Sequence, residues 1–187
     1  IIVFIVQERV GKMSDEFKLF SGVKTVLKCD FTLLLIVVGI FSLGAFNFSF
    51  ILVNAKNAGF SDPLIPLVYA VVNLAHVIIA IPAGVLSDRI GKEKVLVIGY
   101  GTFLTTVLLL YSMPQNGFYP LLIATIYGLY FGITETIQRA LVPQYADSTL
   151  RGTAYGLYYL VVGSAFLVAN TVVGTLWQQY DGPSVAA

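Results

Sequence analysis

Five long apolar segments dominate the sequence and restrict what it can fold into. Short polar connections separate them, and they cover approximately residues 31–53, 63–87, 95–113, 118–142 and 152–177. A helix of about 20 apolar residues, rising 1.5 Å per residue, crosses the roughly 30 Å of hydrocarbon in a bilayer. Membrane-spanning strands would be about half as long and would alternate apolar with polar residues. The segments therefore predict membrane-spanning helices.

The composition agrees with a bilayer environment and argues against several classes of protein. Hydrophobic residues make up 57% of the 187 residues and charged residues only 11%, which is too apolar for a soluble domain. A formal charge of +1 without a basic cluster argues against nucleic-acid binding. The single cysteine, Cys29, has no partner for a disulfide and no spaced His or Cys residues for a metal site. With no nucleotide-binding loop or nucleophile motif either, we expect no enzyme activity, no metal and no cofactor.

Basic residues fall almost entirely on one side when the connections are assigned alternately to the two sides of the membrane. Lys56 alone lies on one side, and the other ten of the eleven Lys and Arg residues share the opposite side: Arg9, Lys12, Lys18, Lys24, Lys28, Arg89, Lys92, Lys94, Arg139 and Arg151. The basic side is predicted to be cytoplasmic. Residues 8–30 are then a cytoplasmic linker with an amphipathic helix, residues 1–7 the end of a preceding membrane helix, and residues 184–187 a possible start of a truncated final helix.

A short charged connection joins the second and third segments at residues 84–95. Gly84 can let a neighbouring helix approach closely, Asp88 can accept from helix N-terminal amides or an arginine, and Gly91 supplies backbone freedom for the reversal. The connection resembles the glycine-x-leucine-x-aspartate-arginine-x-glycine-basic signature of the major facilitator superfamily (MFS), through Gly84, Leu86, Asp88, Arg89, Gly91, Lys92 and Val95. Glu93 departs from the signature, because the family usually has another basic residue there.

Two interpretations of this connection remain open. Its basic residues could be a topological anchor and nothing more, since Lys and Arg flank most cytoplasmic helix ends. For Asp88 and Gly91 we favour a role in gating, in which Asp88 forms an inter-helix contact that breaks and re-forms as the protein changes state.

A second resemblance to the same family lies at residues 139–143 and 150–156, which look like the junction between the fourth and fifth helices of a C-terminal half. The resemblance covers essentially the whole chain, as the seventh to eleventh helices of a twelve-helix prokaryotic-type protein. It implies an all-α membrane protein with an MFS-type helical bundle, in which residues 31–183 hold five complete transmembrane helices of a six-helix half.

The resemblance also implies a function and a location. It indicates a secondary active transporter of small solutes that works by alternating access, in a bacterial or archaeal inner membrane. Its partners would be a small-molecule substrate, the lipid bilayer and the N-terminal six-helix half of the same protein. A non-transporting scaffold or sensor with the same bundle is the alternative. A membrane enzyme would need clustered His, Asp or Glu, which the sequence does not show.

Polar residues inside the spans are candidates for a substrate or proton path, because they are costly in lipid unless they face a partner or a cavity. Tyr69, Asn73 and His76 follow i, i+4, i+7 spacing near the middle of the second span and share one helix face. Imidazoles change charge near neutral pH, so His76 could carry a proton or bind substrate. Equally, His76 could be a packing residue satisfied by a neighbouring helix, and Asn73 could simply join helices.

Further candidates are Asn47 in the first span and Tyr130 and Glu135 in the fourth. Glu135 is the only acidic residue within a predicted span and precedes Arg139 by four residues, the favourable order for an ion pair on one helix face. The pair could be a structural contact near the cytoplasmic mouth, Glu135 could be a proton or cation site, or Arg139 could be the gating partner of Asp88. Proton coupling is a hypothesis that depends on Glu135 and on the histidine of the second span.

Overall fold

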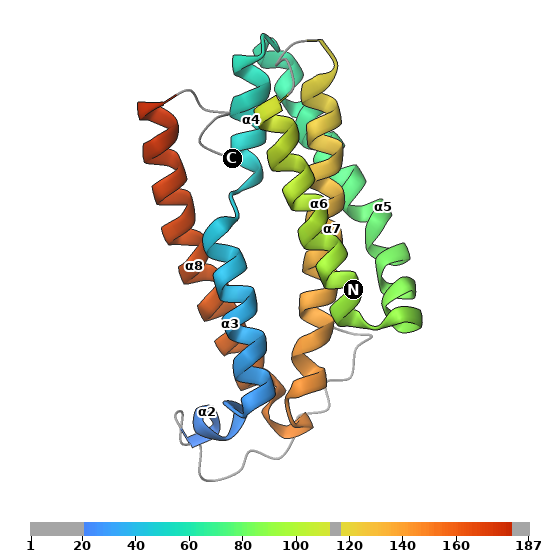
Figure 1. The fold of residues 1–187 in the computed structure, drawn as a ribbon, viewed down its shortest axis with the longest axis vertical. Helices are drawn as coiled ribbons and strands as arrows, with labels where there is room; N and C mark the ends of the chain where they lie inside the picture. The colour runs from blue at the N-terminus through green and yellow to red at the C-terminus, as the bar shows by residue number, and fades with distance from the viewer. Residues whose placement is uncertain (1–20, 113–116, 181–187) are drawn as a thin grey trace, which may run out of the picture.

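The chain folds into a bundle of long helices in the computed structural model, which describes residues 21–112 and 117–180 (Figure 1). In chain order the elements are α2 (Ser21–Val26), α3 (Cys29–Gly44), α4 (Phe48–Asn57), the 3-10 turn η1 (Asp62–Leu64), α5 (Ile65–Ile90), α6 (Lys92–Ser112), α7 (Tyr119–Tyr145), the 3-10 turn η2 (Ser148–Leu150) and α8 (Arg151–Gln179). The described residues contain no strand.

Five helical segments are long and apolar enough to cross a membrane. They are Asp30–Asn57, Asp62–Ile90, Lys92–Ser112, Tyr119–Tyr145 and Ser148–Gln179. The sequence-based prediction of an all-α membrane bundle is thereby confirmed. Residues 1–7, residues 8–20 of the predicted linker, and residues 184–187 lie outside the described residues.

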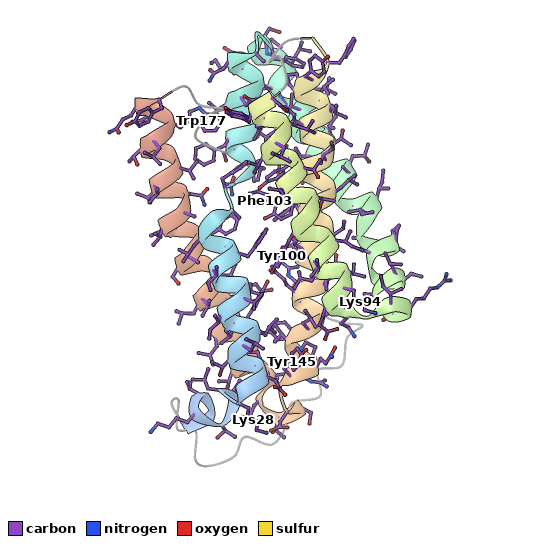
Figure 2. The ribbon with its side chains drawn as sticks, in the orientation of Figure 1. Lys28, Lys94, Tyr100, Phe103, Tyr145 and Trp177 are labelled. Atoms are coloured by element: carbon purple, nitrogen blue, oxygen red, sulfur yellow. The ribbon has the colours of Figure 1, made fainter. Side chains whose placement is uncertain are left out.

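The described end of the linker is docked on the bundle. Val26 of α2 is buried, and Gly22 lies close to the side chains of Leu150 and Thr153 where α8 begins. Lys28 Nζ also lies 3.0 Å from Asp147 Oδ2. Figure 2 shows Lys28, Tyr145 and Lys94 toward one end of the bundle and Trp177 near the other.

Helix α7 is the centre of the bundle. It contacts α3, α4, α5, α6 and α8, and 56% of its most apolar stretch is buried, against 17% for the spans that contain α5 and α8. Figure 1 shows α8 beside α3, while α5, α6 and α7 pack together on the other side. The buried apolar side chains form two clusters, one toward each end of the bundle, and α7 contributes to both. A polar side chain on α7 can therefore reach several other helices.

Two glycines of α7 let α5 approach unusually closely. A Cβ added to Gly128 would lie 2.4 Å from the carbonyl oxygen of Val72, and one added to Gly132 would lie 2.5 Å from the carbonyl oxygen of His76. Small residues four apart on a membrane helix permit this backbone contact. The contact at Gly132 places His76 one turn from Glu135.

The sequence predicted one continuous helix over residues 31–53. In the structure this first span is broken between α3 and α4. Asn47 has an extended backbone and caps α4, because its Oδ1 accepts from Ser49 N at 3.0 Å and from Ser49 Oγ at 2.7 Å. Its own backbone N–H donates to Asn170 Oδ1 of α8 at 2.9 Å. The break is tolerated because polar side chains replace the helical hydrogen bonds that it loses.

The charged connection reverses the chain at a single residue. Helix α5 ends at Ile90, α6 begins at Lys92, and Gly91 between them has φ 98° and ψ 143°. This conformation is favourable only for glycine. The N–H of Gly91 donates to the carbonyl oxygen of Ser87 at 3.0 Å and closes the end of α5.

Candidate functional site

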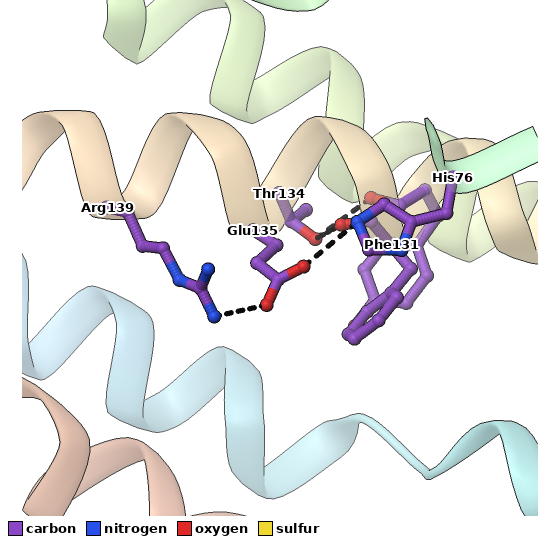
Figure 3. A network of polar contacts seen from close by, with 6 residues as sticks. His76, Phe131, Thr134, Glu135 and Arg139 are labelled. Carbon is purple, nitrogen blue, oxygen red and sulfur yellow. Dashed lines mark hydrogen bonds and ion pairs between the residues drawn. The ribbon is translucent and has the colours of Figure 1, made fainter. Parts of the chain in front are cut away.

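A charged trio joins α5 and α7 inside the bundle (Figure 3). His76 Nε2 lies 2.9 Å from Glu135 Oε2, and Arg139 donates from Nη2 to the other carboxylate oxygen, Oε1. The side chains of His76 and Glu135 are 22% and 24% exposed, whereas that of Arg139 is 50% exposed. We call these three residues the charged trio.

The local sequence explains this geometry. Glu135 and Arg139 lie four residues apart on α7 and share one helix face. Gly132 brings the backbone of α5 against α7, and the His76 ring packs edge-on against Phe131 with centroids 4.8 Å apart. The imidazole is thereby directed at the carboxylate, which has one partner on each oxygen.

A pocket of about 270 Å³ opens beside the trio between α3, α7 and α8. Glu135 and Arg139 line it directly, whereas His76 reaches it through Glu135. The apolar part of the lining is strongly aromatic and includes Phe41, Tyr130, Phe131, Tyr159 and Phe166. The Arg139 guanidinium lies 6.0 Å from the centroid of the Tyr159 ring, at the outer limit of a cation–π contact.

Gln138, which the sequence analysis did not single out, ties three helices together at the same pocket. Its Oε1 accepts from Tyr158 of α8 at 2.8 Å, and its Nε2 donates to Tyr100 of α6 at 3.3 Å. Tyr155 of α8 also donates to the backbone carbonyl oxygen of Arg139 at 3.0 Å. An uncharged polar residue in an apolar run, three residues after Glu135, was the available signal for Gln138.

The other candidates of the spans have structural surroundings of their own. Tyr130 is 3% exposed and belongs to an aromatic cluster, with its ring centroid 4.7 Å from that of Phe103. Asn73 donates from Nδ2 to the carbonyl oxygen of Tyr69 on its own helix at 2.8 Å. Tyr69 is 45% exposed and lies outside the pocket, as does the cap residue Asn47.

The residues of the charged connection stand apart from the trio. Asp88 and Arg89 are exposed in the last turn of α5, and the side chain of Asp88 makes no hydrogen bond or ion pair with any described residue. Arg139, its suggested partner, is bonded to Glu135 instead. A Cβ built on Gly84 would meet no atom of another described helix within 4 Å, so none of the described helices packs closely there. Lys92 is the first residue of α6.

Glu93, which departs from the family signature, has its own partner on α7. Tyr145 donates to Glu93 Oε1 at 2.9 Å, so the acid joins the start of α6 to the end of α7. Its position in the first turn of α6 also suits a negative charge. A second cavity of about 480 Å³ lies next to this contact between α3 and α6, and its lining is mainly aliphatic.

The described residues contain no group of three or more His, Cys, Asp or Glu side chains that could hold a metal ion. The imidazole, carboxylate and guanidinium of the trio can form ion pairs and hydrogen bonds and can exchange protons.

Comparison with known proteins identifies the class. The sequence profile described as Major Facilitator Superfamily matches residues 7–181. The chain therefore belongs to the major facilitator superfamily, and it is an integral membrane protein of that transporter family.

Individual relatives agree with this assignment. The chain is 29% identical over 183 residues to an uncharacterized MFS-type transporter of Methanocaldococcus jannaschii, covering 94% of this chain and 45% of the relative. It is 24% identical over 151 residues to uncharacterized proteins of Mycobacterium bovis and Mycobacterium tuberculosis, covering 81% of this chain and 35% of each relative. The chain thus spans less than half the length of these relatives. No solved structure matches it significantly.

Proposed function

We propose that this chain is the C-terminal half of a secondary active transporter that moves a small solute by alternating access, coupled to protons at the His76–Glu135 pair. The observation that carries the proposal is the charged trio beside an aromatic-lined pocket within a membrane bundle. Family membership and the similarity to an MFS-type transporter support transport as the general activity.

The trio favours a functional role over a purely structural one. Ionisable side chains inside a membrane span are costly and usually mark substrate, ion or proton pathways. A packing contact between α5 and α7 is already supplied by Gly128 and Gly132, so the charges are not needed to bring these helices together. Because one carboxylate serves both an imidazole and a guanidinium, a proton on His76 changes how strongly Glu135 holds Arg139.

The orientation belongs to the same proposal. Lys28, Lys92 and Lys94 lie where the chain turns at one end of the bundle, and Lys56 pairs with Asp62 at 3.0 Å in a connection at the other end. We place the first end in the cytoplasm of a prokaryotic cell. Asp88 and Gly84, which have no close partner in the described chain, would meet the N-terminal half there and gate the path.

The test uses the full-length protein in proteoliposomes with an entrapped pH-sensitive dye. A solute gradient across the membrane should drive proton movement. In the double variant His76→Ala with Glu135→Gln this proton movement should be abolished, while the melting temperature of the variant protein should stay close to that of the unmodified protein. Lys56→Gln is the matched control, because it removes an ion pair outside the pocket. Unchanged solute-driven proton movement in the double variant would reject the site.

A further inference from the structure

The charged side chains that line the pocket beside the trio leave one of them available to a ligand. Both oxygens of Glu135 are already engaged, and Gln138 is bonded through both ends of its amide to tyrosines of α8 and α6. The hydroxyl of Thr134 donates to its own helix. Arg139 donates to Glu135, and no other hydrogen bond of its guanidinium occurs within the described residues. Since the guanidinium has five N–H groups and is half exposed, it is the charged group that remains available to a ligand, beside the neutral hydroxyls of Ser42, Tyr130 and Tyr159.

The walls of the pocket restrict the shape of the rest of the ligand, beyond the group that binds Arg139. Six aromatic residues contribute to the lining, and aromatic faces favour flat apolar rings in stacked or edge-on contact. A volume of about 270 Å³ lies near the small end of the usual range for small-molecule sites, about 300–1,000 Å³. The pocket therefore suits a compact ring with one anionic group.

We infer that the pocket binds a small aromatic or heteroaromatic monocarboxylate, with its carboxylate on Arg139, and that this anion binds together with a proton on His76. The inference rests on the proposed function, because it names the substrate class of the same site. We favour a carboxylate over other anions, because its two oxygens can accept hydrogen bonds from two N–H groups of the planar guanidinium.

Charge balance explains why the proton accompanies the anion. With a neutral imidazole, the charges of Glu135 and Arg139 cancel, and a bound carboxylate would leave an unpaired negative charge in the bundle. A proton on His76 restores neutrality and strengthens the hold of the imidazole on Glu135. Arg139 is then released from Glu135 to face the ligand. By thermodynamic reciprocity, the proton tightens anion binding as much as the anion tightens proton binding.

The groups around His76 on neighbouring helices do not supply a competing charge. Helix α7 presents Glu135, Arg139 and Tyr130, and the titratable residues that α8 contributes to the pocket are Tyr158 and Tyr159. Helix α3 contributes Phe41 and Ser42, neither of which titrates. Lys92, the first charged residue of α6, follows His76 by 16 residues, which corresponds to about 24 Å of helical rise. Helix α4 carries Lys56 in its last turn, and Lys56 is paired with Asp62.

The inference is tested by calorimetric binding to the purified full-length protein. The probes are benzoate, phenylacetate and nicotinate, each paired with its neutral amide, and benzylamine as a cation. The carboxylates should bind at least about tenfold more tightly at about pH 5.5 than at about pH 7.5, because each linked proton contributes up to tenfold per pH unit. Buffers that differ in ionisation enthalpy should show proton uptake on binding.

Variants separate the groups involved. His76→Gln should remove the pH dependence of carboxylate binding. The double variant Glu135→Gln with Arg139→Gln, which leaves no unpaired charge, should lose carboxylate binding while its melting temperature shows that it folds. Arg151→Gln, an exposed arginine outside the pocket, is the matched control and should bind as the unmodified protein does.

The inference is overturned if no carboxylate binds, if the amides or benzylamine bind equally well, or if the affinity does not vary with pH. Carboxylate binding with proton uptake but without any solute flux would sustain the inference and contradict the proposed function. Solute flux with a preference for amides or amines would sustain the function and contradict the inference.

Discussion

Gly132 decides how closely α5 and α7 meet and, through that contact, where His76 lies. We predict that Gly132→Ala destabilises the protein by about 1–3 kcal/mol, because the new Cβ would lie 2.4 Å from Ile79 Cγ2 and 2.5 Å from a backbone oxygen. Thermal unfolding of the purified protein measures the change. Gly101→Ala on α6 is the control, since nothing lies within 4 Å of its added Cβ and its stability should be unchanged or slightly raised. Equal melting temperatures for both variants would contradict the close contact.

At the scale of residues, the sequence indicated which ionisable side chains lie inside the bundle better than it indicated their partners. His76, Glu135 and Arg139 stood out because ionisable groups are rare in apolar spans, and the Glu135–Arg139 contact followed from helical spacing alone. The contact of His76 with Glu135 could not be predicted, because it depends on how two helices are rotated and how closely Gly132 lets them approach. The Gln138 network was missed for the same reason.

At the scale of elements, the break between α3 and α4 is the feature that depends most on a few polar groups. We predict that Asn47→Ala lowers stability by about 0.5–2 kcal/mol, because it removes the cap of α4, while Asn47→Ser retains most of the cap. Thermal unfolding of the two variants provides the comparison. Alanine and serine variants of equal stability would show that the cap contributes little.

Hydrophobic length was sufficient to predict the spans but not this break. The run from Phe31 to Val53 is apolar enough that hydropathy carries no sign of an interruption. Asn47 and Ser49, two residues apart, form a helix-start signal, yet an asparagine inside a span also fits a cavity lining. The acceptor that supports the break, Asn170, comes from a distant helix and has no local signature.

At the scale of the whole molecule, we proposed that a second half contacts the end of the bundle that carries the charged connection. Asp88 is exposed, Gly84 faces open space, and the relatives are more than twice as long as this chain. We predict that Asp88→Asn in the full-length protein lowers kcat by about ten- to a hundredfold with little change in KM. The proposed gate contact of Asp88 with a charged group of the second half would form in one state only, and its loss would cost about 1.5–3 kcal/mol.

Asp147→Asn is the control for this variant, because it removes an exposed ion pair with Lys28 at the same end of the bundle. Its kcat should stay close to that of the unmodified protein. If the kcat of Asp88→Asn is as high as that of the control, the gating role of Asp88 is contradicted. The charged connection is then a topological anchor only.

In the proposed mechanism, Glu135 couples protonation of His76 to movement of the solute. The test measures two kinds of solute flux in proteoliposomes that contain the full-length protein with Glu135→Gln. One is accumulation of the solute driven by a pH gradient, and the other is exchange of the solute at equal pH on both sides. We expect exchange to continue, because it needs no net proton movement, and gradient-driven accumulation to be lost. Accumulation that remains at the level of the unmodified protein would contradict the proposed mechanism.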